Sequence, residues 1–160
     1  METTHLENIF RIVHGNKFDL NKMKLAGSNK EAIAFVGRSS EKNGIVAHVE
    51  KYKDIEPFPT GFITVALGGS TLSSFVQPRP FYTAQNIDVL EPLSEMSLDV
   101  KLYYCLCVEA NRFRYSTFGR EANRTLRILD VPKRESVPKW VEGAAKKSLE
   151  ELKLDLTSML

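Results

Sequence analysis

Five arginines lie within residues 111–127, where Glu121 is the one acidic residue. They are Arg112, Arg114, Arg120, Arg124 and Arg127. Aromatic side chains and a glycine are interleaved with them, at Phe113, Tyr115, Phe118 and Gly119. A guanidinium group offers a planar fork of N–H donors that fits phosphate oxygens or the edge of a guanine. The whole chain carries a formal net charge of only +2, so the excess is local. The segment therefore favours a surface that binds nucleic acid.

A second interpretation of these arginines stays open at this point. Arginine-rich segments also form solvated faces whose charges are balanced by nearby carboxylates. Such carboxylates lie just upstream, with Lys101 as the one basic residue among them: Asp88, Glu91, Glu95, Asp99 and Glu109. The arginines could pair with these groups and bind no ligand.

Motifs of catalysis are missing from the chain. The glycines at Gly68 and Gly69 lack the lysine and the spacing of a phosphate-binding P-loop, and neither a G-x-S-x-G nor an H-E-x-x-H motif occurs. The nearest approach to a metal-dependent nuclease centre is Glu50, Lys51 and Asp54, in a charged, loop-like stretch. We therefore predict no catalytic residue, no metal site and no cofactor.

Two glycine-bearing loops could add to the arginine surface. In residues 68–71 and 37–40, bare backbone amides and small hydroxyls follow a predicted strand, and the second loop carries Arg38. Such loops either bring backbone close to a phosphate or base edge, or are tight turns in which glycine permits a positive φ. Together with the arginines they suggest that several strand ends converge on one charged ligand.

The elements that would position these residues are mostly strands. Strand patterns occur at residues 9–13, 32–38, 45–49, 61–67, 72–77, 81–90 and 126–131. Asn43 and Gly44 form a strong turn signal, so residues 32–49 are expected to be a hairpin. Residues 97–111 fit either a strand or a helix, and their length favours a helix. Cys105 and Cys107 are expected to be reduced, buried strand residues, because a spacing of two puts both on one face of a strand.

The C-terminal segment has a different pattern. After a charged linker from Pro132 to Pro138, apolar residues recur at alternating spacings of four and three: Ala145, Leu149, Leu152, Leu156 and Met159. This is a heptad-like seam on a helix, which could pack on its own domain or pair with a partner helix. The expected fold class is α+β: a mostly β domain with a few short helices over residues 1–132, then a linker and heptad-patterned helix over residues 133–160.

The bulk composition is that of an ordinary globular protein, 42% hydrophobic and 26% charged over 160 residues. No apolar run approaches the ~20 residues that span a bilayer. The first residues lack the pattern of a secretory signal peptide, so a cytoplasmic location is expected.

The order of these segments resembles a known family. Residues 61–70 (GFITVALGGS), 80–90 (PFYTAQNIDVL) and 111–132 are similar to the target recognition domain of restriction–modification DNA specificity subunits. The resemblance is to the type I specificity subunit and the related type IIB and IIG recognition modules, and covers residues 33–132. It implies an α+β recognition fold, followed by a helix that acts as a spacer or dimer arm.

The resemblance also implies function, partners and contacts. Such a domain binds one half of a bipartite double-stranded DNA site, while methylation and cleavage belong to a methyltransferase and a restriction subunit or domain. The resemblance further implies a homodimer that forms through the C-terminal helix, and it implies no binding to a membrane. We expect base contacts from Arg38, Arg79, Arg112 and Arg114. Backbone contacts are expected from Ser39, Asn43, Ser70, Thr71, Tyr82, Tyr115, Arg120 and Arg124. The alternatives are a protein–protein docking module and, less favoured, a small metal-dependent nuclease.

Overall fold

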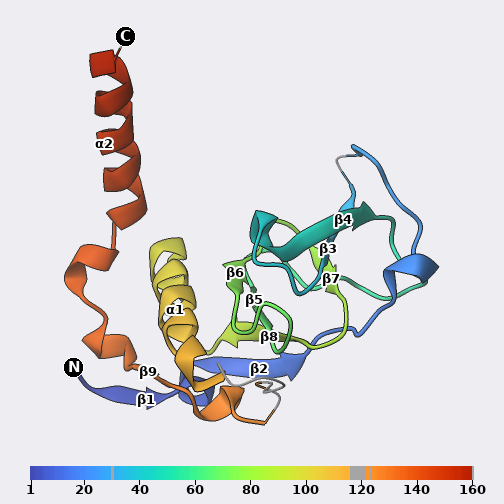
Figure 1. Ribbon diagram of the computed structural model, residues 1–160, viewed down its shortest axis with the longest axis horizontal. Coiled ribbons are helices and arrows are strands. Elements are labelled where there is room, and N and C mark those ends of the chain that lie inside the picture. The colour runs from blue at the N-terminus through green and yellow to red at the C-terminus, as the bar shows by residue number, and fades with distance from the viewer. Residues whose placement is uncertain (30, 116–121, 123, 160) are drawn as a thin grey trace.

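The strands lie together in one body, and a helix near the C-terminus projects away from it (Figure 1). The computed structural model describes residues 1–29, 31–115, 122 and 124–159. Within these residues the strands form a four-stranded sheet, a three-stranded sheet and a two-stranded pair. Short 3-10 turns occur between the strands and helices, at Leu6–Asn8, Leu20–Lys22, Lys42–Gly44, Arg112–Tyr115, Leu126–Ile128, Arg134–Ser136 and Lys139–Val141.

The four-stranded sheet is antiparallel and lies in the middle of the body. Its order is β2 (Phe10–His14), β8 (Ile87–Pro92), β5 (Ile63–Ala66) and β6 (Ser74–Val76). Alternate side chains face opposite sides of a strand. Accordingly, Ile12 and Leu90 join the core cluster that includes α1, while Val13 and Val89 join the cluster with the three-stranded sheet. The sheet is therefore covered on both faces.

The three-stranded sheet contains the predicted hairpin. Its order is β4 (Ile45–Val49), β3 (Ile33–Val36) and β7 (Phe81–Thr83), with β3 antiparallel to β4 and parallel to β7. Asn43 and Gly44 take φ of +57° and +73°, the left-handed conformation that the turn signal predicts. The hairpin is thus confirmed.

The single strand predicted over residues 81–90 is wrong. The segment forms two strands, β7 and β8, which belong to different sheets. Asn86 between them has a φ of +57°, a conformation that cannot continue an extended strand. The strand predicted at residues 126–131 is also partly wrong, because the 3-10 turn Leu126–Ile128 precedes β9 (Asp130–Pro132). β9 pairs with β1 (Thr3–His5).

Residues Leu98–Ala110 form the helix α1, as their length predicted. Ser97 caps it, since its hydroxyl accepts a hydrogen bond from the Val100 amide at 3.3 Å. The helix anchors Tyr104, which is fully buried and donates from its hydroxyl to the Pro132 carbonyl at 2.8 Å.

The two cysteines are helical, so the prediction of strand residues is wrong. Residues two positions apart in a helix lie about 200° apart around its axis, because each residue turns the chain by ~100°. Cys105 accordingly is buried and Cys107 only half-buried, and both thiols are free. Burial raises the pKa of the Cys105 thiol to about 12.

The chain stays attached to the body beyond β9. Val141 is 2% exposed and belongs to the main core cluster, and the Gly143 amide donates to the Asp99 carboxylate at 2.8 Å. The helix α2 (Ala144–Met159) then projects away from the body (Figure 1), and none of its described residues is buried. Packing of the heptad seam on its own domain is therefore wrong.

Among the described residues, no helix combines the length and apolarity needed to cross a membrane.

Candidate nucleic-acid interface

Three loops meet at one edge of the sheets. They follow β3, β5 and β7, and the parallel pair β3 and β7 places two of these loops at the same end. Backbone hydrogen bonds join them in three places: Ser70 N to Arg38 O at 3.3 Å, Leu67 N to Asn86 O at 2.9 Å, and Ala84 N to Val36 O at 2.9 Å. The convergence of strand ends expected from the sequence is therefore present.

Gly69 permits the closest approach in this junction. Its φ is +66°, and a Cβ at this position would lie 3.1 Å from the Cβ of Arg38 and 3.5 Å from the Arg38 carbonyl oxygen. Both the conformation and the space therefore favour glycine. The loop after β5 is thus packed directly against the residue that carries the Arg38 guanidinium.

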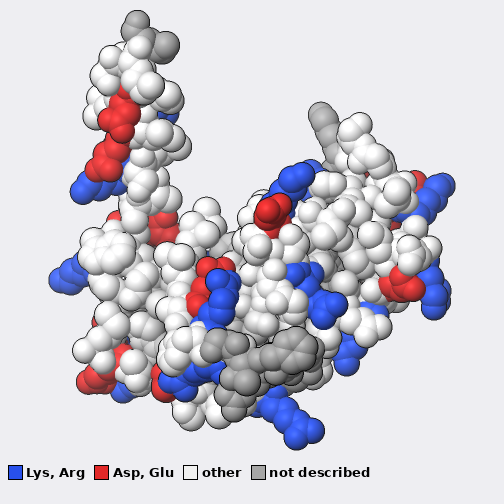
Figure 2. Space-filling view, in the orientation of Figure 1, with Lys and Arg blue, Asp and Glu red and all other residues white. Residues whose placement is uncertain are grey.

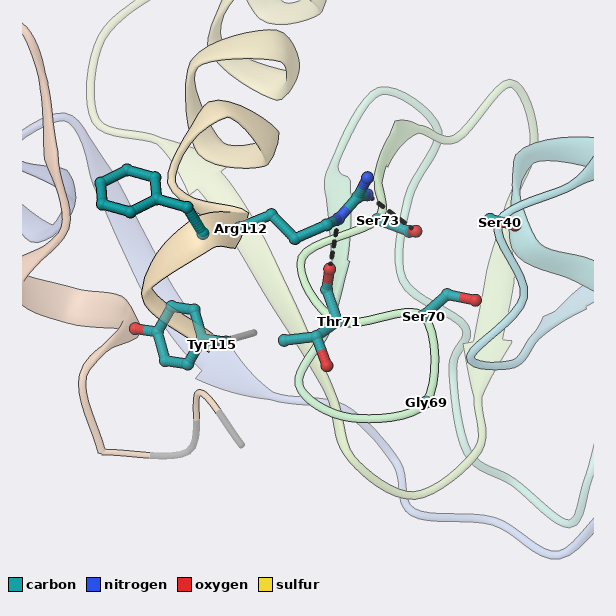
Figure 3. A pocket seen from close by; sticks show the side chains of 8 residues that line it. Ser40, Gly69, Ser70, Thr71, Ser73, Arg112 and Tyr115 are labelled. Carbon is teal, nitrogen blue, oxygen red and sulfur yellow. Dashed lines mark hydrogen bonds between the residues drawn. The ribbon is translucent and has the colours of Figure 1, made fainter. Parts of the chain in front are cut away.

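Arg112 reaches the same loop from the end of α1. Its Nε donates to the Thr71 carbonyl at 2.9 Å and its Nη2 to the Ser73 hydroxyl at 3.4 Å (Figure 3). The turn that carries Arg112 is held by buried Asn111, whose side-chain amide donates to the carbonyls of Cys107 and Asp130 at 3.0 and 3.2 Å. Guanidinium has five N–H donors, so Arg112 is oriented by its own protein and keeps donors for a ligand.

An open hollow of about 610 Å³ lies beside Arg112. Its lining, shown in Figure 3, is Ser40, Gly69, Ser70, Thr71, Ser73, Arg112, Phe113 and Tyr115. The hydroxyls and the cation suit an anion, and the aromatic rings could stack on a base. Four of the predicted contact residues line it: Ser70, Thr71, Arg112 and Tyr115. Ser73 carried no sequence signal, whereas Ser40 belongs to the loop singled out at residues 37–40 and Phe113 was visible as an aromatic residue among the arginines.

Arg114 and Tyr115 have partners within the protein. Arg114 Nη2 lies 3.6 Å from the Asp130 carboxylate, and its guanidinium lies over the Phe113 ring at 5.6 Å. The Tyr115 hydroxyl hydrogen-bonds to the Thr125 hydroxyl. The solvated-face interpretation therefore describes Arg114 better than Arg112. Arg124 is exposed, and Arg120 lies outside the described residues.

Three of the upstream carboxylates form hydrogen bonds or ion pairs with residues of the four-stranded sheet. Glu91 pairs with Arg11 at 2.8 Å, and Glu109 accepts from the Ser74 amide at 3.0 Å. Asp88 pairs with His14 at 2.8 Å and is 3% exposed. Burial raises the pKa of Asp88, although His14 and the positive charge of Arg127 oppose this shift. These carboxylates therefore bind residues of β2 and β6, the two edge strands of the four-stranded sheet.

Other predicted contacts lie around the junction or away from it. Arg38 is exposed at the end of β3, and the hydroxyl of Ser39 accepts from the Glu41 amide at 3.1 Å. Asn43 is exposed, and its carbonyl accepts from the Gln77 side chain at 2.8 Å. Arg79 precedes β7, so it lies at the opposite end of the parallel pair from Arg38.

Tyr82 is a core residue, and the prediction that it contacts DNA is wrong. It is 0% exposed. Its hydroxyl donates to the Ile55 carbonyl at 2.6 Å and accepts from the Tyr52 amide at 3.1 Å. A buried tyrosine needs such partners for its hydroxyl. The side chain therefore fixes residues 52–55 rather than reaching a ligand.

The acidic residues considered for a nuclease do not gather into a site. Glu50 pairs with Lys24 at 3.5 Å, and Lys51 pairs with Glu56. Within the part of the chain that the structure describes, no three His, Cys, Asp or Glu side chains are grouped so that they could hold a metal ion.

Comparison with known proteins points to one family. A family model described as the type I restriction modification DNA specificity domain matches residues 1–129. The type II restriction enzyme BgcI specificity subunit S.BcgI of Heyndrickxia coagulans is 24% identical over 138 residues, which cover 84% of this chain and 39% of that protein.

Solved structures agree in fold. The S subunit of a type I restriction-modification system from M. genitalium has a TM-score of 0.64 at 16% identity, over 98% of this chain and 42% of that one. The HsdS subunit from Thermoanaerobacter tengcongensis has a TM-score of 0.64 at 12% identity, over 98% and 39%. The chain thus spans about two fifths of the length of these relatives. Since the family model covers most of its residues, the chain belongs to the type I restriction modification DNA specificity domain family.

Proposed function

We propose that the chain binds double-stranded DNA in a sequence-specific manner, as the recognition component of a restriction–modification system. Membership in a DNA specificity domain family supports this function. The single observation that carries it is the position of Arg112, held by Thr71 and Ser73 at an open hollow that is lined by hydroxyls and aromatic rings. An oriented guanidinium loses less freedom on binding a base edge or phosphate than a mobile one.

The contacts follow from the junction of the three loops. Arg112 and Arg38 are the proposed base contacts near the hollow, with Ser70, Thr71 and Tyr115 against the backbone. Arg79 would contact a separate part of the duplex. Ser39, Asn43, Arg114 and Arg124 remain in the proposed set at its margin.

Catalysis is assigned to partners. We propose that methylation is carried out by a methyltransferase subunit or domain, and cleavage by a restriction subunit or domain, all in the cytoplasm. The exposed seam of α2 supports helix pairing, with a second copy of this chain as one proposed partner. The same helix also supports the second candidate function, a docking module without DNA contacts.

Selection from a randomised duplex pool tests the function. The purified chain is equilibrated with the pool at two salt concentrations, and bound duplexes are sequenced. We expect a short enriched motif at both concentrations, with affinity falling as salt rises because each neutralised phosphate contributes about −0.9 to the log–log slope. Binding without an enriched motif would contradict sequence recognition. Absence of binding would favour the docking module.

A further inference from the structure

A second hollow, of about 390 Å³, lies beyond the junction of the loops. We call it the lysine hollow, since Lys17, Lys22 and Lys53 line it together with one acidic residue, Asp19. The rest of its lining is Phe18, Met23, Tyr52, Ile55 and Gln85. Three cations therefore stand beside one carboxylate here, whereas in the chain as a whole Lys and Arg outnumber Asp and Glu only by 22 to 20.

The three lysines are available to a ligand. Each is exposed, and none forms an ion pair with another of the described residues. Lys53 Nζ lies 5.1 Å from the centre of the Tyr52 ring. Asp19 is used locally, because its carboxylate accepts from the Asn21 amide at 3.0 Å and caps the turn Leu20–Lys22.

The floor of the lysine hollow is formed by packed aromatic rings. Phe18 packs on Tyr52 and Tyr82, with ring centres 5.0 and 5.3 Å apart. Buried Tyr82 ties the backbone of Tyr52 and Ile55 through its hydroxyl. Lys17 and Lys53 both have positive φ, at 61° and 52°. Lysine adopts this conformation rarely and at some cost, so the surrounding packing holds both residues in place.

The lysine hollow is continuous with the interface described above. A third hollow shares Phe18, Asp19 and Gln85 with it, and this third hollow is also lined by Arg38. The Arg38 carbonyl in turn accepts from the Ser70 amide, and Ser70 lines the hollow of Arg112. Cationic groups therefore follow one another from Arg112 through Arg38 to the lysines. On the face drawn in Figure 2, basic side chains occur in separate groups with acidic and uncharged surface between them.

We propose that the lysine hollow is a second binding site for the phosphodiester backbone of the same DNA duplex. The inference rests on the proposed function and deepens it. Lysine is a compact charge that binds phosphate without the planar fork needed for a base edge. The lysine hollow therefore adds affinity and fixes the duplex on the protein, while the choice of bases stays with the arginine side of the junction.

The test compares two triple variants of the full chain with matched charge changes. The first is Lys17→Gln, Lys22→Gln and Lys53→Gln together. The control is Lys146→Gln, Lys147→Gln and Lys153→Gln, three exposed lysines of α2. Binding is measured over a series of salt concentrations on a duplex with the selected motif and on a scrambled duplex, and thermal unfolding shows that both variants fold.

We expect the lysine-hollow variant to lower the magnitude of the log–log salt slope by up to about 0.9 per lysine. Its affinity should fall by the same factor on both duplexes, and the control should match the unmodified chain. If the lysine-hollow variant still selects the motif and its salt slope is unchanged, the lysine hollow is not a backbone-binding site, and the proposed function is unaffected. An equal loss in the control would rule out such a site as well. If the unmodified chain binds neither duplex, both proposals fail.

Discussion

Arg112 is bound by its own protein before it meets a ligand. Its hydrogen bonds to the Thr71 carbonyl and the Ser73 hydroxyl use the edge of the guanidinium that faces the loop. The charge alone could attract a phosphate, but only the oriented fork can distinguish bases. Charge and geometry can therefore be separated by substitution at this one position.

Arg112→Ala should cost about 1–3 kcal/mol of DNA binding and relax the preference at one base position. Arg112→Lys should relax the preference in the same way but keep the salt slope, because it retains the charge and loses the fork. Motif selection and binding over a salt series measure both. Arg11→Ala is the control, since Arg11 pairs with Glu91 outside the hollow. Unchanged preference in both Arg112 variants would make this arginine a solvated group.

Tyr82 gives the opposite case, a residue whose importance lies in stability. Tyr82→Phe should lower the free energy of unfolding by about 1–3 kcal/mol, because the Tyr52 amide and the Ile55 carbonyl lose their partner. Urea unfolding measures the loss, and motif selection should return the unchanged sequence preference. A changed preference at full stability would restore Tyr82 as a DNA contact.

Arg112 and Tyr82 show how much of the candidate site the sequence could predict. Arginines and glycine loops identified Ser70, Thr71 and Arg112, which the structure brings together. Sequence spacing could not show that β3 and β7 are parallel, and this arrangement separates Arg79 from Arg38. Nor could it show that Tyr82 faces inward, because both alternating sets of residues 81–90 mix apolar and polar side chains.

At the scale of elements, the sequence predicted correctly those elements that depend on residues close together in the chain. The hairpin of β3 and β4 follows from Asn43 and Gly44, and α1 from the length of its apolar pattern. The division between β7 and β8 was missed. Both strands are buried, and polar residues occur inside them, at Thr83 and Asp88, as well as between them, at Gln85 and Asn86, so polarity does not mark the break.

The helix α2 has a seam without a partner on its own domain. Leu149, Leu152 and Leu156 are 56%, 55% and 52% exposed, which is costly for a stripe of leucines in water. We expect a concentration-dependent dimer in analytical ultracentrifugation, and Leu152→Asp should shift it to monomer. Leu154→Asp is the matched control, because Leu154 is equally apolar but lies off the seam at 71% exposure. A monomeric parent chain at all concentrations would exclude the homodimer and leave the seam to another subunit.

At the scale of the whole molecule, the core ends later than the linker prolines suggested. Val141 belongs to the main cluster, Trp140 packs on Tyr103 with ring centres 6.2 Å apart, and the Gly143 amide binds Asp99. Residues 133–143 are therefore part of the folded body, whereas α2 buries nothing against it. This division predicts different effects for two truncations of the chain.

A chain of residues 1–143 should unfold at the same urea concentration as residues 1–160, when both are measured dilute enough that dimerisation adds no stability. A chain of residues 1–132 should lose at least about 1.5–3 kcal/mol, the contribution of burying one valine side chain. The loss should be larger if the contacts of Trp140 and Gly143 also contribute. Equal destabilisation of both truncated chains would mean that α2 supports the domain directly. A stable 1–132 chain would instead place the domain boundary at Pro132, and would make residues 133–143 a linker that only rests on α1.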